Sequence, residues 1–150
     1  MIIVCAVTGS TFVGMITGFK LLAKIDPSSP PHCVIRIDAS AKPAETKVQV
    51  LCIAKIGLSE VDITEVDVVL DERYHAGSYG ILDKQTIEAI EYGVRMDAFI
   101  TDPVYKGKSL AGMIDMIRKG EIKGGNVLYM HLGGQLALNA YSDMENKVGA

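Results

Sequence analysis

The stretch Met1-Ile-Ile-Val-Cys-Ala-Val-Thr-Gly-Ser-Thr11 and the apolar run that follows it, Phe12 to Ala23, decide the predicted fold. Met1–Val7 is short, uncharged and rich in β-branched residues, which is typical of a strand buried on both faces. The run from Phe12 to Ala23 is too long for a strand and predicts a helix. Its Gly14 and Gly18 lie four residues apart, so we expect a smooth helix face pressed closely against a sheet.

The loop between these two segments, Thr8–Thr11, consists of small residues with hydroxyl groups. A helix N-terminus after such a loop presents free backbone N–H groups and a positive dipole end to a phosphate. Gly9 allows close approach of the backbone, although the loop lacks a P-loop lysine and the three-glycine spacing of a dinucleotide fingerprint. The pattern alone leaves two interpretations open, a phosphate cradle and an N-capped helix that follows a core strand.

Composition indicates one soluble α/β domain over residues 1–150. The chain is 49% hydrophobic and 22% charged, with 15 glycines and no tryptophan, which fits a packed core and not a disordered chain. The net charge of -3 has the wrong sign for a nucleic-acid surface, so we expect no nucleic-acid partner.

The cysteines and histidines predict neither a disulfide framework nor a metal site. The cysteines form no CxxC pair and are expected to be buried thiols in a reducing, cytoplasmic compartment; they are Cys5, Cys33 and Cys52. The histidines share no metal-ligand spacing; they are His32, His75 and His131.

The N-terminus also raises a membrane alternative, because no charge precedes Lys20. Thr8–Thr11 interrupts the apolar run, however, and no basic region comes before it. We therefore expect neither a membrane span nor a signal peptide.

Strands and helices are predicted to alternate along the chain. The predicted strands are Ile2–Val7, Val34–Ile37, Val66 to Leu70 (which includes Val68–Leu70) and Val127–Met130, with a further short segment at Ala98–Thr101. The predicted helices are Phe12–Ala23, Pro43–Lys55, a segment capped by Asp83, and Ser109–Lys119. This order predicts an α/β fold with a doubly wound, mainly parallel sheet and helices on both faces.

Ligands of such sheets bind outside the carboxyl ends of the strands. The loops expected at that edge are rich in glycines, carboxylates and tyrosines; they are Thr8–Thr11, Asp38–Lys42, Asp71–Gly80, Asp102–Gly107 and Leu132–Gly134. We expect the functional site there.

Six strings, spread in order over essentially the whole chain, resemble 1-aminocyclopropane-1-carboxylate (ACC) deaminase. They are Val4–Thr11, Ile37–Ala44, Val68–Arg73, Thr101–Tyr105, Tyr129–Gly134 and Ala137–Ser142. The wider family is fold type II of the pyridoxal phosphate (PLP) enzymes, and the resemblance implies its large-domain portion and PLP as cofactor. It covers only the family's C-terminal portion. The lysine that binds PLP covalently and a serine near the substrate belong to the N-terminal portion, which has no counterpart in these residues.

The resemblance also implies roles for individual residues. The residues that match the cradle of the PLP phosphate are Val7, Thr8, Gly9, Ser10 and Thr11. Tyr79 and Tyr105 match the two catalytic tyrosines that face the substrate, although two tyrosines simply packed in loops are the alternative. Leu132 matches a residue near the cofactor ring.

One departure falls inside the implied cofactor site. Lys106 stands where the deaminase has a glutamate beside the pyridine nitrogen. A carboxylate there favours a protonated ring nitrogen, whereas a cation opposes it and weakens the electron sink.

The implied function is that of a carbon–nitrogen hydrolase of amine catabolism, converting ACC to 2-oxobutanoate and ammonia. We expect this chain to be inactive alone. The expected partners are a small-molecule substrate (ACC or a related amino acid) and either further copies of the chain, as a homo-oligomer, or the missing N-terminal half. The alternatives are a non-catalytic phosphate- or PLP-binding remnant and a D-cysteine desulfhydrase-like protein. The string Asp38–Pro43 and Leu132 favour the deaminase.

Overall fold

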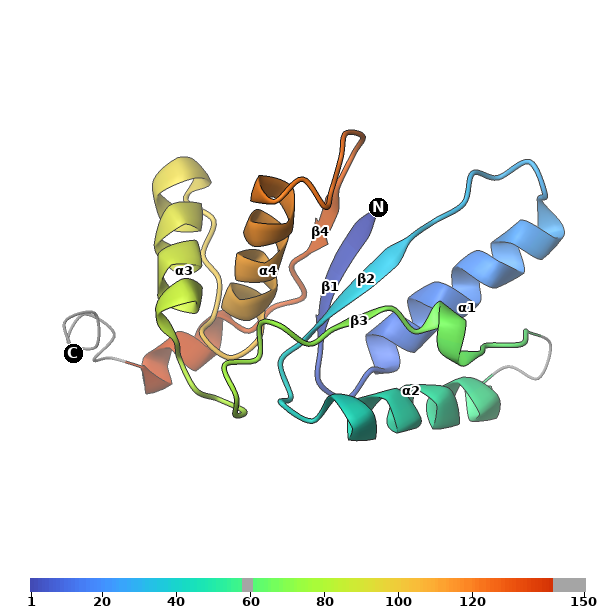
Figure 1. The fold of residues 1–150 in the computed structure, drawn as a ribbon, viewed down its shortest axis with the longest axis horizontal. Coiled ribbons are helices and arrows are strands. Elements are labelled where there is room, and N and C mark those ends of the chain that lie inside the picture. Colours follow the sequence, from blue (N-terminus) through green and yellow to red (C-terminus); the bar gives the residue numbers. More distant parts are fainter. Residues whose placement is uncertain (58–60, 142–150) are drawn as a thin grey trace.

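A computed structural model describes residues 1–57 and 61–141 of the chain. Four strands form one sheet in the order β3-β2-β1-β4 (Figure 1). Every pairing in this sheet is parallel, so the predicted parallel α/β fold is confirmed. The strands are β1 (Ile2–Ala6), β2 (Val34–Asp38), β3 (Leu70–Asp71) and β4 (Leu128–Met130).

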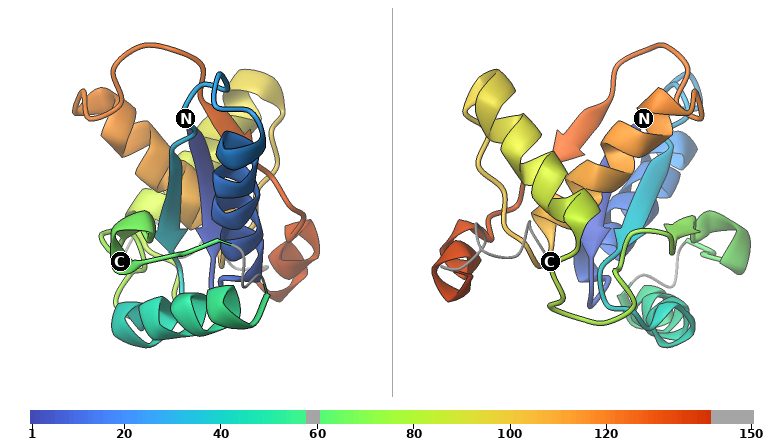
Figure 2. Two further views of the ribbon diagram at one scale, coloured as in Figure 1. Left: turned by 90° about the vertical axis from the view of Figure 1, so that its right-hand side faces the viewer. Right: turned by 60° about the vertical axis from the view of Figure 1, so that its left-hand side comes forward.

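Helices cover both faces of the sheet (Figure 2). On one face lie α1 (Ser10–Ile25) and α2 (Pro43–Gly57). On the other face α4 (Lys106–Arg118) contacts β1 and β2, and α3 (Lys84–Asp97) packs beside α4. Two short 3-10 helices, η1 (Glu65–Asp67) and η2 (Gln135–Ala140), complete the described elements.

The core consists of two layers separated by β1 and β2, whose ten residues are all buried. Alternate side chains of these strands point to opposite faces. On the first face Ile2, Val4 and Val34 pack against α1 and α2. On the second, Ile3, Ile35 and Ile37 pack with Tyr74 and Met116. Burial on both faces explains the uninterrupted β-branched sequence of β1.

The prediction of a strand over Val66 to Leu70 is largely wrong, because only Leu70 and Asp71 form β3. Glu65–Asp67 is helical instead. The Asp67 carboxylate accepts hydrogen bonds from the backbone N–H of Thr64 at 2.8 Å and from Lys20 Nζ at 2.6 Å. These local bonds outweigh the β propensity of the valines. The segment Ala98–Thr101 forms no strand either, because Ala98 ends α3 in the left-handed region with φ 52°.

Two helices start at carboxylates that accept backbone N–H groups. Asp83 accepts the Thr86 N–H at 2.9 Å and caps α3 as predicted. Helix α4 begins at Lys106, three residues before the predicted Ser109. The reason is Asp102, whose carboxylate accepts hydrogen bonds from the N–H groups of Tyr105 and Lys106 at the start of this helix.

Two expectations about burial are wrong. Gly14 and Gly18 do not press against the sheet, because no atom lies within 4 Å of the place that a Cβ on either residue would take. The sheet-facing side of α1 consists instead of Phe12, Val13, Ile16 and Thr17, because large apolar side chains gain more from burial than glycine does. Cys5 is buried as predicted, but Cys33 and Cys52 are exposed. In the described residues, no helix combines the length and the apolarity that a membrane span requires.

Two Gly→Ala substitutions in helices are expected to change stability in opposite directions. Gly14→Ala should stabilise the protein by about 0.5–1 kcal/mol, because alanine favours a helix and the site is open. Gly107→Ala should destabilise it by about 1–3 kcal/mol, because the new Cβ would lie 2.7 Å from the Asp102 carbonyl oxygen and 2.9 Å from Ile90 Cδ1. Urea unfolding of both variants measures the difference. Equal shifts would contradict this packing.

Candidate active site

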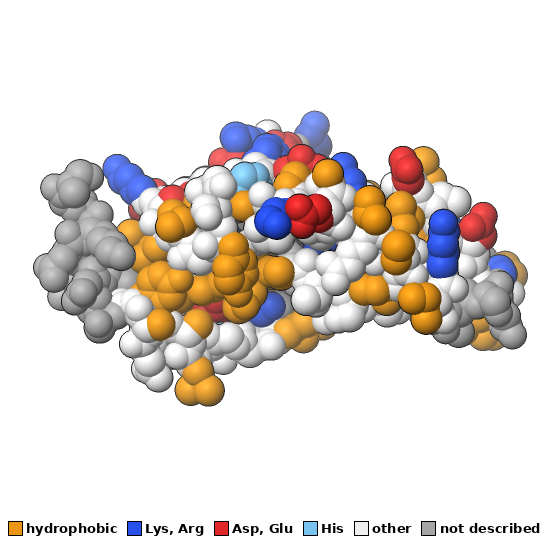
Figure 3. Space-filling view, turned by 90° about the horizontal axis from the view of Figure 1, so that it is seen from below, with side chains coloured by type: hydrophobic (Ala, Val, Ile, Leu, Met, Phe, Trp, Pro, Cys, Tyr) orange, Lys and Arg blue, Asp and Glu red, His pale blue; other side chains and the backbone are white. Residues whose placement is uncertain are grey.

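The order of the strands places a crevice at the carboxyl end of β1. The chain passes from β1 to β2 to β3 in one direction across the sheet and then returns to add β4 on the opposite side of β1. At such a reversal, here between β1 and β4, the loops after the two neighbouring strands turn to opposite faces of the sheet. The crevice between these loops is where such sheets bind ligands. Figure 3 shows this end of the molecule, where hydrophobic side chains gather beside a hollow.

The turn from β1 into α1 requires a glycine. Gly9 has φ 85°, in the left-handed region, and a Cβ there would lie 2.6 Å from Val50 Cγ2. No side chain caps α1, and Val13 N–H to Gly9 C=O at 2.9 Å is the bond that opens the helix. The N–H groups of the first turn are therefore available to an anion.

A hollow of about 390 Å³ lies at this turn. Its lining residues come from β1, the following loop, the first turn of α1, the loop before α3 and the start of α4; they are Cys5, Ala6, Val7, Thr8, Gly9, Thr11, Tyr79, Tyr105 and Lys106. Seven of the nine residues that the sequence singled out thus lie around one hollow. Ser10 and Leu132 do not line it, and both are exposed.

The two tyrosines meet across the hollow although 26 residues separate them in the chain. Their phenol oxygens are hydrogen-bonded to each other, and their rings meet edge to face with centroids 6.0 Å apart. The hydrogen bond with Tyr79, together with burial, raises the pKa of Tyr105 to about 12. Tyr105 therefore remains a protonated hydrogen-bond donor at neutral pH.

The backbone of Lys106 is held at two atoms. Its N–H donates to Asp102 Oδ2 at 3.0 Å, and its carbonyl oxygen accepts from the Tyr129 hydroxyl at 2.6 Å. Its side chain lines the hollow, and the residue is only 7% exposed. The neighbouring Cys5 is a neutral thiol, because burial raises its pKa to about 12 against the opposing charge of Lys106.

Asp102 holds the backbone at the start of α4, beside the hollow. This residue was not singled out from the sequence. It is fully buried, and its carboxylate accepts the N–H groups of Val104, Tyr105 and Lys106 at 3.0, 2.7 and 3.0 Å. A Cβ at Gly134 would overlap Asp102 Oδ2. Asp102 thereby joins the start of α4 to the loop after β4, and Gly134 is the residue that allows this contact.

Lys108 is a second residue that sequence reasoning missed, because nothing distinguishes it from the other lysines in the sequence. Its side chain is fully buried, and Nζ donates to the carbonyl oxygens of His75 at 2.8 Å and Ser78 at 3.3 Å. Burial lowers the pKa of Lys108. This lysine fastens the loop that carries Tyr79 onto α4.

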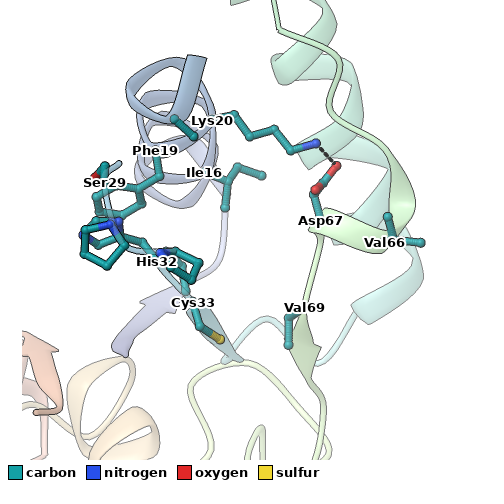
Figure 4. A pocket seen from close by; sticks show the side chains of 13 residues that line it. Ile16, Phe19, Lys20, Ser29, His32, Cys33, Val66, Asp67 and Val69 are labelled. Atoms are coloured by element: carbon teal, nitrogen blue, oxygen red, sulfur yellow. Dashed lines mark hydrogen bonds and ion pairs between the residues drawn. The ribbon is translucent and has the colours of Figure 1, made fainter. Parts of the chain in front are cut away.

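A second hollow, of about 380 Å³, lies near the amino end of β2 (Figure 4). Its walls are mostly apolar, with Ile16 and Phe19 from α1 and the Lys20–Asp67 ion pair at one side. It contains none of the residues predicted for the site. Within residues 1–57 and 61–141, no group of three or more His, Cys, Asp and Glu side chains is placed to hold a metal ion.

Fold and hollow together define the class of protein: a parallel α/β protein with a hollow at the uncapped N-terminus of a helix. The chain is 51% identical over 147 residues to a probable ACC deaminase of Cryptococcus neoformans var. neoformans serotype D. It is 53% identical over 146 residues to the ACC deaminase of Ralstonia pickettii. These alignments cover 95% and 94% of the chain and 41% of each relative.

A solved structure of an ACC deaminase homologue matches with a TM-score of 0.67 and 26% identity, over 88% of this chain and 38% of that one. No family model matches. The resemblance inferred from the sequence is confirmed, because the chain is homologous to a portion of ACC deaminases. It spans about two fifths of the length of these curated relatives. Ser142, which ends the last of the six strings, lies outside the described residues.

Replacing Lys108 by methionine is expected to loosen the Tyr79 loop. The change leaves the buried carbonyls of His75 and Ser78 without their shared donor, so we expect a loss of about 1–3 kcal/mol in unfolding free energy. Amide hydrogen exchange across residues 75–80 should accelerate more than exchange in α1. Lys84→Met, which removes an exposed charge on α3, is the matched control. Unchanged exchange in the loop would contradict the anchoring role.

Proposed function

We propose that this chain is the part of an ACC deaminase-lineage protein that holds the phosphate group of PLP and presents two tyrosines to an amino-acid substrate. The activity proposed for the whole protein is the conversion of ACC to 2-oxobutanoate and ammonia. The supporting observation is that the cradle residues Val7–Gly9 and Thr11, both tyrosines and Lys106 line one hollow. The relatives named above, both ACC deaminases by name, favour this activity over D-cysteine desulfhydration.

The residues present fit PLP. A hollow of about 390 Å³ falls within the usual size of small-ligand pockets. Gly9 holds the turn in the left-handed region with φ 85°, and the uncapped N-terminus of α1 offers N–H donors to a phosphate. When bound, PLP supplies an electron sink for the carbon skeleton of the substrate.

The tyrosine pair can orient an anionic substrate. Tyr105 keeps its proton well above neutral pH, so its hydroxyl donates a hydrogen bond to a carboxylate instead of repelling it. Tyr79, 51% exposed, stands at the opening, where its ring limits the access of water. We assign Tyr105 the carboxylate contact and Tyr79 the support of that hydroxyl through their mutual hydrogen bond.

Lys106 sets a limit on catalysis in this chain. Two like charges ~4 Å apart repel by about 4 kcal/mol at an effective dielectric near 20. A protonated pyridine nitrogen beside Lys106 would meet this repulsion, and the low exposure of the lysine restricts its escape toward solvent. Lys106 is thus the observation that favours the second candidate function, a non-catalytic phosphate- or PLP-binding protein.

Binding of PLP through its phosphate group is tested on the chain itself. Titration with PLP should shift the amide NMR signals of Gly9, Ser10 and Thr11 in a saturable way, whereas pyridoxal without the phosphate should leave them in place. Gly9→Ala is expected to abolish the response, and Gly14→Ala, an open position, to retain it. A response to PLP confined to other residues would place the cradle elsewhere.

The effect of Lys106 is tested in a relative that has the whole chain length. Introducing lysine at the aligned position of the Ralstonia pickettii deaminase, where the resemblance implies a glutamate, should lower kcat by about a hundredfold or more. Glutamine at the same position separates the loss of the acid from the added positive charge, and should cost less than lysine. Near-normal turnover with lysine would show that the cation is tolerated.

A further inference from the structure

Arg36 is a fully buried cation in the middle of β2. It pairs with Val4 across the sheet, and its side chain reaches the Phe12 ring of α1, with Cζ 5.9 Å from the ring centroid. The same face of the sheet carries apolar side chains such as Val34 and, two residues after Arg36, the fully buried carboxylate of Asp38, whose Oδ2 has no hydrogen-bond partner. A guanidinium removed from water costs free energy unless its donors and its charge are matched.

The donors of Arg36 are mostly unmatched. One terminal nitrogen, Nη2, donates to the Val7 carbonyl oxygen at 3.3 Å, while Nε and Nη1 are buried without a partner. In the described part of the chain no ion pair joins Arg36 to a carboxylate. Burial lowers the pKa of Arg36 to about 10, with Asp38 opposing from two residues further along β2. The side chain is therefore cationic at neutral pH.

The guanidinium lies directly behind the turn that forms the candidate site. Its Nη2 contacts Val7, and its Nη1 lies 3.7 Å from the position that a Cβ on Gly9 would take. Val7 and Gly9 line the hollow, and Phe12 belongs to the first turn of α1. The positive end of the α1 dipole and the buried charge of Arg36 therefore both raise the electrostatic potential at the Val7–Gly9 turn.

We propose that Arg36 belongs to the anion site as its counter-charge, acting from behind Gly9 on a phosphate dianion held by Thr8–Thr11. This inference rests on the proposed function, in which the phosphate group of PLP occupies the cradle, and adds a residue from a different strand. An anion at the turn adds to the partial compensation from Asp38 and faces a guanidinium whose Nε and Nη1 have no hydrogen-bond partner. Arg36 is a positioning residue, because it acts through the turn and does not line the hollow.

Titration of the wild-type chain with inorganic phosphate provides a direct test. The amide signals of Gly9 and Thr11 and the Arg36 Nε–H signal should shift together, with one dissociation constant. In Arg36→Met the dissociation constant should rise about tenfold or more. The unfolding transition of this variant, measured without phosphate, establishes whether it is folded at the titration temperature. Arg36→Lys retains a charge and should bind more tightly than Arg36→Met.

The controls separate this inference from the proposed function. Lys84→Met removes one exposed positive charge on α3 that does not line the hollow and should bind phosphate like the wild type. If the wild-type Gly9 and Thr11 signals do not respond, the cradle and the role of Arg36 both fail. If they respond while Arg36 Nε–H does not shift, or Arg36→Met binds phosphate within twofold of wild type, the cradle stands and the inference about Arg36 is overturned. The wild-type Nε–H signal decides the matter if Arg36→Met does not fold.

Discussion

Strand β1 pairs with β2 along one edge and with β4 along the other, and all five of its residues are buried. The strand is therefore enclosed by its neighbours, and the chain continues from its carboxyl end into the loop before α1. There Val7–Gly9 must reverse the chain tightly enough to lay α1 against the sheet. Gly9 makes the reversal possible with φ 85° and without a Cβ, since Val50 occupies the space. No side chain caps the first N–H groups of α1, which follow this turn, so the packing of the central strand also fixes where these free donors lie.

Three of the fully buried charged side chains organise the loops around this turn, and they differ in how well they are matched. Asp102 accepts three backbone N–H groups, and Lys108 donates to two carbonyl oxygens. Each of these groups replaces its lost hydration with hydrogen bonds to the loop that it fixes. Arg36 makes one such bond and leaves two nitrogens unpartnered. Asp102 and Lys108 are thus matched by hydrogen bonds within the fold, whereas Asp38 offsets the charge of Arg36 only in part, which leaves it able to respond to an anion at the turn.

Sequence reasoning predicted the features that depend on local pattern. The β-branched segments at Ile2 and Val34 became β1 and β2, and Asp83 capped α3 where expected. It failed where a long-range contact decided the outcome. Lys20, 47 residues away in the chain, binds Asp67 and favours η1 over the predicted strand. Gly14 lies in open space because α1 buries Phe12 and Ile16 against the core, which turns Gly14 away from it. Arg36, Asp102 and Lys108 could not be singled out, because their importance depends on which carbonyls and N–H groups the folded chain brings to them.

The two cations nearest the turn affect a bound ligand in opposite ways. Arg36 lies behind Gly9, where only the anionic end of a phosphate-bearing ligand benefits from its charge. Lys106 lines the hollow itself, where the proposed function places the rest of the ligand. A positive charge that develops on a ring nitrogen is opposed there, while a phosphate or a carboxylate is attracted. The electrostatics of this chain therefore favour holding an anionic ligand over stabilising a cationic ring, so affinity for PLP and turnover of ACC need not change together. Because the two effects come from different strands and helices, substitution at Arg36 and substitution at Lys106 separate them.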